Sequence, residues 1–292
     1  MPINPSAVGT SFGPSTASWD ASDALLYALG VGAGRDDLPF TTEHSTGFEQ
    51  KVLPTFALVI GQVGRERARS PRGGNVHPLA AVGTFNPAMV VHAGSSVELP
   101  APLPPTGTVE MTGKIAAIWD KGSGALVVLE SEGRSQGSGD LVFRTTFSAF
   151  IRGEGGFGGD RGPTSSGQGS PDRAPDHVIS YPTSPDQALL YRLSGDRNPL
   201  HSDPEFAKMA GFDNPIMHGL CTFGFTGRAL LTSLCGSDPI RFLRMEGRFS
   251  KPVVPGDELT VDIWVDGTMA TFRTRNHLGD VAIDQGTCRF SV

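Results

Sequence analysis

Apolar residues recur at helical spacing in one long segment of the second half of the chain. Leu220, Phe223 and Leu231 lie on one face of residues 219–236, GLCTFGFTGRALLTSLCG, at the i, i+3, i+4, i+7 spacing of an α-helix. Gly236 suits the position just after a helix ends. The pattern therefore predicts one long apolar helix.

Glycines and prolines divide this half further. Gly224 and Gly227 lie on the apolar face of the long helix, where we expect them to let a sheet approach closely. The segment QALLYRL (187–193) is predicted to be helical and to end at Gly195. Residues 203–211, DPEFAKMAG, predict a short helix with an aspartate N-cap, a proline in the first turn and a glycine at the end.

β-branched and alternating residues separated by turns predict antiparallel strands in both halves of the chain. The predicted strands are 126–131, 141–151, 258–265, 269–276 and 281–292. Each half is predicted to have its helix first and then several strands. This order indicates an α+β fold in which a long helix packs across a curved antiparallel sheet.

A segment rich in glycine, proline and serine separates the halves. Residues 153–176, GEGGFGGDRGPTSSGQGSPDRAPD, cannot bury enough apolar surface to offset the entropy of ordering them. We expect a linker or long surface loop there. The predicted domains are 1–152 and 177–292.

Three blocks recur in the same order on the two sides of this segment, which indicates duplication of one fold unit. The paired blocks are 23–34 with 187–198, 52–61 with 216–225, and 102–111 with 252–261. In the first pair, Gly32 stands opposite Asp196. The second copy thus has polar groups where the first has glycine and alanine. Similar amphipathic helices alone would not explain the shared order.

Composition narrows the class of protein. The formal net charge is −6, which makes nucleic acid or an anionic membrane surface a poor partner. No apolar run approaches the roughly 20 residues of a membrane-spanning helix. Three cysteines without metal-site spacing, and no secretory or peroxisomal signal, favour a reducing, cytoplasmic location. Residues 64–77 form a basic, glycine-rich insertion that we expect to be a mobile surface loop.

The chemistry gathers in LSGDRNPLHSD, residues 193–203. Asp196, Asn198 and His201 flank Pro199, which keeps the helix from resuming, so they are predicted to share an irregular loop. A carboxylate and an imidazole five residues apart on such a turn can converge on one water molecule, which the amide of Asn198 can orient. Turn capping and simple packing would explain any one of them alone, but not the group.

The start of the long helix is a second candidate. The N–H groups of its first turn, beginning at Gly219, have no intrahelical partner, so they can stabilise a carbonyl oxygen that gains negative charge. A tight helix entry explains this glycine equally well. A metal site formed by Asp196, His201, Asp203 and His218 is weaker, because no supporting cysteine or HxxxH pattern is present. A serine hydrolase is weaker still, since there is no GxSxG motif.

Residues 191–225, YRLSGDRNPLHSDPEFAKMAGFDNPIMHGLCTFGF, resemble the signature of the R-specific (type 2) enoyl-CoA hydratases, a MaoC-like double hot-dog family. This family includes the hydratase domain of peroxisomal multifunctional enzymes type 2 and bacterial stand-alone relatives. LLYALGVGAG, LPTFALVIGQ, GGFGG and RFSKPVVPGDEL also resemble it, so the likeness covers nearly the whole chain. The resemblance implies two tandem hot-dog units, each with a sheet wrapped around a long central helix. It also implies that the first unit lost its catalytic loop and holds the acyl chain and CoA.

The resemblance also implies roles for individual residues. The catalytic set would be Asp196 and His201, with Asn198 holding the water, the Gly219 N–H as oxyanion donor, and Glu43. The substrate contacts would be His92, Ala93, Arg197, Pro199, Leu200 and Phe249, with Lys251 or Arg248 near the CoA 3′-phosphate. Ala93 departs from the glycine that is usual in the family at this position.

The expected activity is reversible hydration of a trans-2-enoyl-CoA to a (3R)-3-hydroxyacyl-CoA, in fatty acid metabolism or that of related acyl or steroid side chains. Acyl-CoA would be the partner molecule. We expect no organic cofactor or metal, because the thioester itself activates the alkene. A homodimer is expected from the resemblance. Two alternatives stay open: a hot-dog acyl-CoA thioesterase, and a non-catalytic acyl-CoA-binding subunit.

Overall fold

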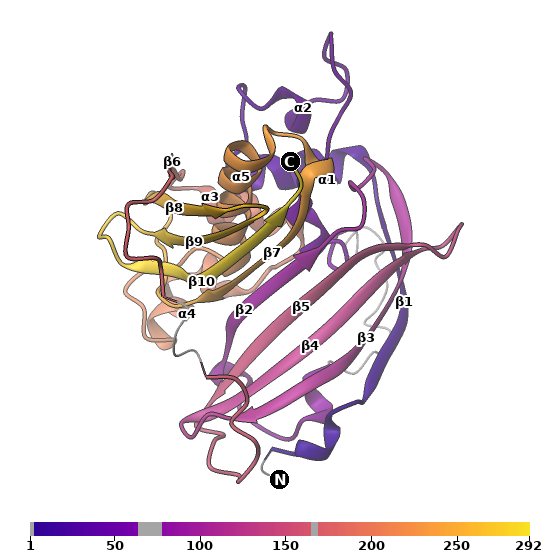
Figure 1. The fold of residues 1–292 in the computed structure, drawn as a ribbon. Helices are drawn as coiled ribbons and strands as arrows, with labels where there is room; N and C mark the ends of the chain where they lie inside the picture. The colour runs from indigo at the N-terminus through magenta and orange to yellow at the C-terminus, as the bar shows by residue number, and fades with distance from the viewer. Residues whose placement is uncertain (1–2, 64–77, 165–168) are drawn as a thin grey trace.

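The strands of the computed structural model form one continuous antiparallel sheet (Figure 1), and the structure describes residues 3–63, 78–164 and 169–292. The insertion at 64–77 lies outside the described residues. The strands are β1 (Ser11–Trp19), β2 (Val90–Glu98), β3 (Gly107–Asp120), β4 (Gly124–Ser135), β5 (Leu141–Arg152), β6 (His177–Pro182), β7 (Phe242–Phe249), β8 (Glu258–Asp266), β9 (Met269–Arg275) and β10 (Val281–Phe290).

Short helices and one long helix connect these strands. The α-helices are α1 (Ala21–Gly30), α2 (Leu38–Thr41), α3 (Gln187–Tyr191), α4 (Pro204–Met209) and α5 (Gly219–Cys235). The 3₁₀ turns are η1 (Pro5–Ala7), η2 (Pro54–Leu58), η3 (Pro78–Ala81), η4 (Pro87–Met89), η5 (Arg192–Ser194), η6 (Pro199–His201) and η7 (Pro239–Arg241). Within the described ranges, no helix has the length and apolar character needed to cross a lipid bilayer.

The order of the strands shows the duplication that the repeated blocks indicate. The sheet runs β1-β3-β4-β5-β2 and then β7-β10-β9-β8-β6, so each half uses its strands in the same relative order. The halves join where β2 pairs with β7, with Gly94 opposite Arg248 and Glu98 opposite Arg244. Helices α1 and α3 follow β1 and β6 in equivalent places and pack against each other. The predicted α+β class and tandem arrangement are confirmed.

The sequence pattern missed five strands: β1, β2, β3, β6 and β7. Each half begins with a strand, β1 or β6, before its first helix, so the predicted helix-first order is wrong. Both are the outermost strands of the sheet. The Gly13-Pro14 pair in β1 favours a turn by composition, and an edge strand tolerates proline because one side of its backbone has no pairing partner. The five strands that were predicted all form, several of them longer than expected.

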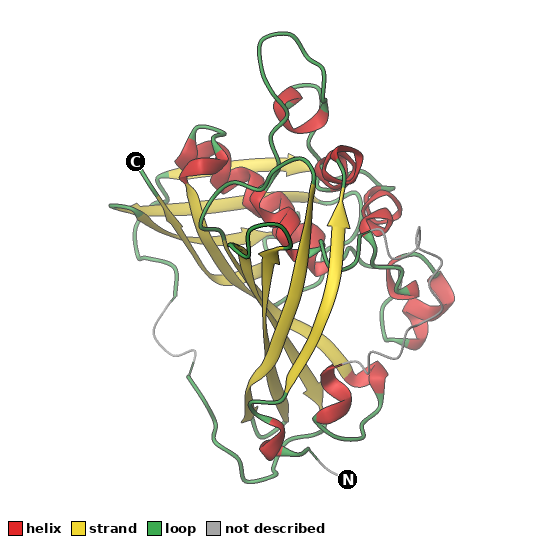
Figure 2. Cartoon of the chain, turned by 90° about the vertical axis from the view of Figure 1, so that its right-hand side faces the viewer, coloured by secondary structure: helices red, strands yellow, loops and turns green. Residues whose placement is uncertain are grey.

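Helix α5 lies in the hollow of the curved sheet, where Figure 2 shows it as the longest helix. Thirteen of its 17 residues are buried, and Gly236 follows it in the left-handed region at φ 60°. The glycines on its face approach the first half more closely than they approach the sheet, where a methyl group on Gly227 would lie 3.5 Å from Met245 Sδ of β7. A methyl group on Gly224 would lie 2.4 Å from the Val31 side chain, and one on Gly227 would lie 2.6 Å from Thr55. The close approach is therefore to α1 and η2 of the first half.

The first half has no counterpart of α5 among the described residues. Its aligned segment, 52–61, forms only the short turn η2 followed by further turns. The expected long central helix is thus present in the second half alone. This segment does not form a long helix because Val59, Ile60 and Gly61 are poor helix formers. Phe56 and Ile60 are buried in the same core cluster as the residues of α5, which stabilises the turns of this segment.

The predicted linker is not loose at its start. The carboxylate of Asp120, at the end of β3, accepts hydrogen bonds from the N–H groups of Gly156 (2.8 Å) and Gly158 (2.9 Å). Lys121 donates to the carbonyl oxygens of Arg161 and Pro163. The segment from 153 to 163 is therefore tied to the β3–β4 hairpin, although its composition is that of a linker.

Candidate active site

The loop between α3 and α4 is shaped by its own short side chains. Gly195 ends η5 with φ 121°, and a methyl group there would lie 2.7 Å from Gln62. The Asn198 side-chain oxygen accepts the N–H of Leu200 at 3.0 Å and so caps η6, which Pro199 begins. Asp203 caps α4 in the same way. The predicted irregular loop between two helices is confirmed.

This loop brings the predicted acid and imidazole together. The potential ligand atoms of Asp196, His201 and His218 all lie within 4.8 Å of one another. His201 Nδ1 lies 2.8 Å from the carbonyl oxygen of Ile216. Because a carbonyl oxygen only accepts, Nδ1 must carry the hydrogen, and Nε2 keeps its lone pair in the neutral ring.

His218, which directly precedes α5, is the third member of the cluster. Its ring stacks on that of His201 with centroids 3.7 Å apart and planes tilted by 29°. Its Nε2–H donates to the main-chain oxygen of Asp196 at 3.2 Å. Only 1% of His218 is exposed, so the residue is enclosed by the loop that it holds. We refer to Asp196, His201 and His218 together as the acid–imidazole cluster.

Both imidazoles of the cluster are kept neutral at pH 7. Burial lowers the pKa of His201 below its ordinary value, against the opposing effects of the Ile216 carbonyl and Asp196. Burial, followed by the neighbouring His201, lowers the pKa of His218 to about 4. A neutral His201 with a free Nε2 lone pair can accept a proton.

The cluster has residue types that bind metals, but the ring geometry opposes a shared ion. An imidazole ligand directs a lone pair in its ring plane at an ion about 2.1 Å away. The stacked rings of His201 and His218 lie in nearly parallel planes, so their lone pairs do not converge. Asp203, the fourth candidate ligand, has its carboxylate occupied in capping α4.

Gly219 begins α5 beside this cluster. No acceptor for its N–H is found among the described residues, as expected for the first position of a helix. A methyl group on Gly219 would lie 3.3 Å from the ring of Phe249, so a side chain would press on that ring. The N–H is thus placed at the positive end of a 17-residue helix.

The predicted contact residues of the two halves meet across the β2–β7 junction. The His92 ring lies 4.7 Å from that of Phe249 and 4.2 Å from that of Phe147. The register of β2 against β5 shifts between His92 and Gly94, so Ala93 is the extra residue of a β-bulge. Burial lowers the pKa of His92 to about 4, which makes this wall neutral.

The remaining predicted residues lie farther out. Arg197 and Leu200 are half-buried on the loop, whereas Asn198 and Pro199 are exposed. Lys251 is exposed just beyond β7. Arg248 precedes Phe249 on β7, so its side chain lies on the opposite face of the sheet from Phe249, where it pairs with Asp284 at 3.7 Å. Glu43 is exposed in the loop after α2, which projects from the fold in Figure 1. The structure does not bring Glu43 to the cluster.

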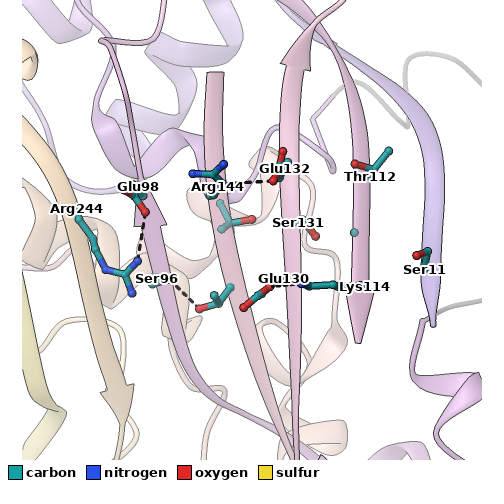
Figure 3. Close-up of a pocket in the computed structure, with 13 residues that line it drawn as sticks. Ser11, Ser96, Glu98, Thr112, Lys114, Glu130, Ser131, Glu132, Arg144 and Arg244 are labelled. Carbon is teal, nitrogen blue, oxygen red and sulfur yellow. Dashed lines mark hydrogen bonds and ion pairs between the residues drawn. The ribbon is translucent and has the colours of Figure 1, made fainter. Parts of the chain in front are cut away.

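A separate pocket of about 410 Å³ lies across β1 to β5 and β7 (Figure 3). Serine and threonine line it together with charged residues that pair with one another, such as Glu132 with Arg144 and Lys114 with Glu130. None of the predicted site residues lines this pocket. Sequence reasoning predicted the site residues away from this pocket, in the acid–imidazole cluster, but it considered His218 only as a metal ligand. The available signal was the histidine directly before the glycine that begins α5.

Comparisons with known proteins match both halves of the chain. Residues 18–153 match the family described as MFE-2 hydratase 2 N-terminal domain, and residues 166–285 match the MaoC like domain. The 3-hydroxyacyl-thioester dehydratase Y of Mycobacterium tuberculosis is 45% identical, with 99% of each chain covered. Enoyl-CoA hydratase ChsH3 of the same organism is 41% identical, with 91% of each covered. The crystal structure of a MaoC-like dehydratase from Phytophthora capsici is 32% identical, with a TM-score of 0.87 over 99% of this chain and 98% of that one.

Proposed function

This chain belongs to the MaoC-like dehydratase family, with an MFE-2 hydratase 2 N-terminal domain before its MaoC-like domain, and from this premise we propose that it is a hydro-lyase. It reversibly hydrates trans-2-enoyl-CoA thioesters to (3R)-3-hydroxyacyl-CoA. The acyl group belongs to a fatty acid or to a related acyl or steroid side chain. The observation that carries this proposal is the convergence of Asp196 and His201 beside the start of α5.

The helix start accounts for activation of the thioester. The carbonyl oxygen accepts the N–H of Gly219, and negative charge grows on that oxygen as the alkene electrons shift toward it. The positive end of α5 stabilises this charge. One such donor is worth about 3 kcal/mol in the transition state.

The cluster accounts for activation of water. Neutral His201 accepts a water proton at Nε2 while the water oxygen forms a bond to C3, and the alkene electron pair moves onto the thioester oxygen. The enolate then collapses, and C2 receives a proton from the same face through the Asp196–His201 pair. Each such acid–base group contributes about 10²–10⁴-fold to the rate. The amide of Asn198 holds the water.

The rest of the chain binds the substrate in this proposal. Residues 1–152 form the unit that holds the acyl chain and CoA, 153–176 connect the units, and 177–292 carry the chemistry. The binding wall consists of His92, Ala93, Phe249, Arg197, Pro199 and Leu200, with Lys251 beside the CoA phosphate. The thioester activates its own alkene, so the reaction requires no further cofactor.

We extend the proposal to a homodimer in the cytoplasm. The three cysteines are free and buried, which suits a reducing compartment. Measurement of the solution mass by light scattering tests the dimer, and a mass of one chain would contradict it.

Assays with crotonyl-CoA and a graded series of longer enoyl-CoAs test the activity. We expect loss of the enoyl-thioester absorbance without release of thiol, and an R product by chiral analysis. Asp196→Asn and His201→Ala should each lower kcat by about 10²-fold or more. Asp203→Asn and His277→Ala are matched controls, because they alter an N-cap and an exposed histidine outside the cluster.

Two results would contradict the proposed function. Thiol release at the rate of substrate loss would indicate a thioesterase. Near-wild-type turnover by both folded cluster variants would show that the chemistry lies elsewhere.

A further inference from the structure

His218 is an enclosed member of the acid–imidazole cluster. Its ring lies between those of His201, at 3.7 Å, and Tyr191, at 4.9 Å. The residue is 1% exposed, and the hydrogen bond of its ring among the described residues goes to the main-chain oxygen of Asp196. The residue therefore contacts both groups that carry the proposed chemistry.

We propose that His218 is a positioning residue for hydration, whose ring supports the His201 imidazole by stacking and holds the Asp196 main chain by a hydrogen bond. This inference rests on the proposed function and extends it. The stack limits His201 to the ring orientation in which Nδ1–H reaches Ile216. The hydrogen bond fixes the turn from which the Asp196 carboxylate projects.

The surroundings of His218 oppose its protonation. Its Nδ1 is buried and has no hydrogen-bond partner among the described residues, so a proton there would add a buried donor without an acceptor. The groups that face it are His201 from η6, Asp196 from the loop, Tyr191 from α3 and Arg192 from η5. The positive end of α5 further disfavours a charged ring.

A neutral His218 has a consequence for His201. The stacked ring of His218 covers one face of the His201 imidazole and so reduces its contact with water. Burial is the main cause of the lowered pKa of His201, so the cover contributes to keeping His201 unprotonated. The two contacts of His218 thus have different effects. The stacked ring helps to keep the pKa of His201 low, and the N–H holds the main chain of Asp196 in place.

Three variants separate these contributions. His218→Gln keeps an amide N–H able to reach the Asp196 carbonyl but loses the aromatic stack. His218→Phe keeps the stack but loses the donor. His218→Ala loses both. Leu231→Ala, also in the buried core of α5 but remote from the loop, controls for loss of stability alone. Each variant is measured for thermal unfolding and for the pH profiles of kcat and kcat/KM with crotonyl-CoA.

We expect His218→Ala to lower kcat by about 10–100-fold while KM changes by less than about threefold, as for misplaced catalytic groups. Its acidic limb of kcat/KM should move to higher pH, because water enters beside His201. His218→Phe should keep the limb of the wild type but lose kcat, and His218→Gln should recover kcat relative to alanine. Leu231→Ala should lower Tm without moving the limb.

The inference is overturned if folded His218→Ala keeps kcat within about twofold and an unmoved acidic limb, or if Leu231→Ala reproduces its profile. Should the alanine variant not fold, the glutamine and phenylalanine variants decide, and equal profiles for the two would equally refute it. Absence of hydration by the wild-type protein would instead contradict the proposed function itself, so the two failures are distinguishable.

Discussion

Single residues show how far spacing alone carries a prediction. Asp196 and His201 were predicted to converge because Pro199 forces a turn within a five-residue span, and the structure shows their side chains together. The tautomer of His201 was not predictable, because it depends on the hydrogen bond to the carbonyl oxygen of Ile216, 15 residues away in the sequence. His218 and Tyr191 meet that loop only through tertiary stacking, which leaves no periodic signal in the chain.

At this scale the proposed mechanism makes the pH dependence of the reaction follow from the protonation of His201. Its pKa is lowered by burial, so the ring is neutral at pH 7 and becomes protonated only below the ordinary value of about 6.5. Activity that needs the free Nε2 lone pair is therefore complete at neutral pH and falls as the pH drops through that lowered pKa. We expect kcat/KM for crotonyl-CoA to stay level from pH 8 to about 6.5 and to decline below it.

Rates measured in overlapping buffers of constant ionic strength check this expectation. As the control for inactivation, protein exposed to each pH is returned to neutral pH and assayed again. A decline that already begins above pH 7 would show that His201 is not the neutral base.

At the scale of elements, the long helix was the most predictable part of the fold. An apolar face sustained over five turns, with a glycine at its end, predicted α5 to within one residue. The packing of this helix across a sheet was predicted, but the partners of its glycines were not, since small residues on a helix face only indicate close approach. The closest neighbours of Gly224 and Gly227 are Val31, directly after α1, and Thr55 of η2. The edge strands β1 and β6 were missed because they need only one pairing partner and tolerate turn-forming residues.

Replacement of Gly224 tests this contact. The methyl group of Gly224→Ala would lie 2.4 Å from Val31 Cγ1 and 2.9 Å from the Tyr27 hydroxyl. Overpacking of this kind costs about 1–3 kcal/mol, which exceeds the roughly 1 kcal/mol that alanine gains over glycine in a helix. We expect a net loss of unfolding free energy.

Urea denaturation measures the difference in unfolding free energy. Thr232→Ala, at an exposed position of the same helix, is the matched control and should leave stability unchanged or slightly raised. A stabilised Gly224→Ala would mean that α1 does not press on the helix.

At the scale of the whole molecule, the two halves are joined by more than the shared sheet. Arg228 of α5 is 6% exposed and pairs with Asp37 of the first half at 2.8 Å. The same guanidinium donates to the Val31 carbonyl at 3.1 Å and lies 4.5 Å from the centre of the Tyr181 ring. A repeat in the sequence could predict two similar halves, but not the cross-contacts that lock them together.

Removal of this ion pair should therefore weaken the whole fold. Arg228→Gln leaves Asp37 half-buried without its cation, and breaking a buried pair costs about 3–5 kcal/mol, somewhat less here because Asp37 is partly exposed. Arg35→Gln removes a guanidinium that is 93% exposed, so its effect should stay below about 0.5 kcal/mol. Thermal and urea unfolding of both variants check the difference. Equal stability of the two would show that the tie between the halves contributes nothing.

The seam between β2 and β7 places His92 from one copy against Phe249 from the other, while only the later copy has an aspartate where the earlier has Gly32. In a dimer of two identical single units, both units have the same sequence. Both would therefore have to keep the reactive groups. Covalent fusion removes that obligation. In the proposed function, one copy then retains the groups that transfer protons, and the other is free to diverge in size and shape, so that a change in acyl preference leaves the chemistry undisturbed.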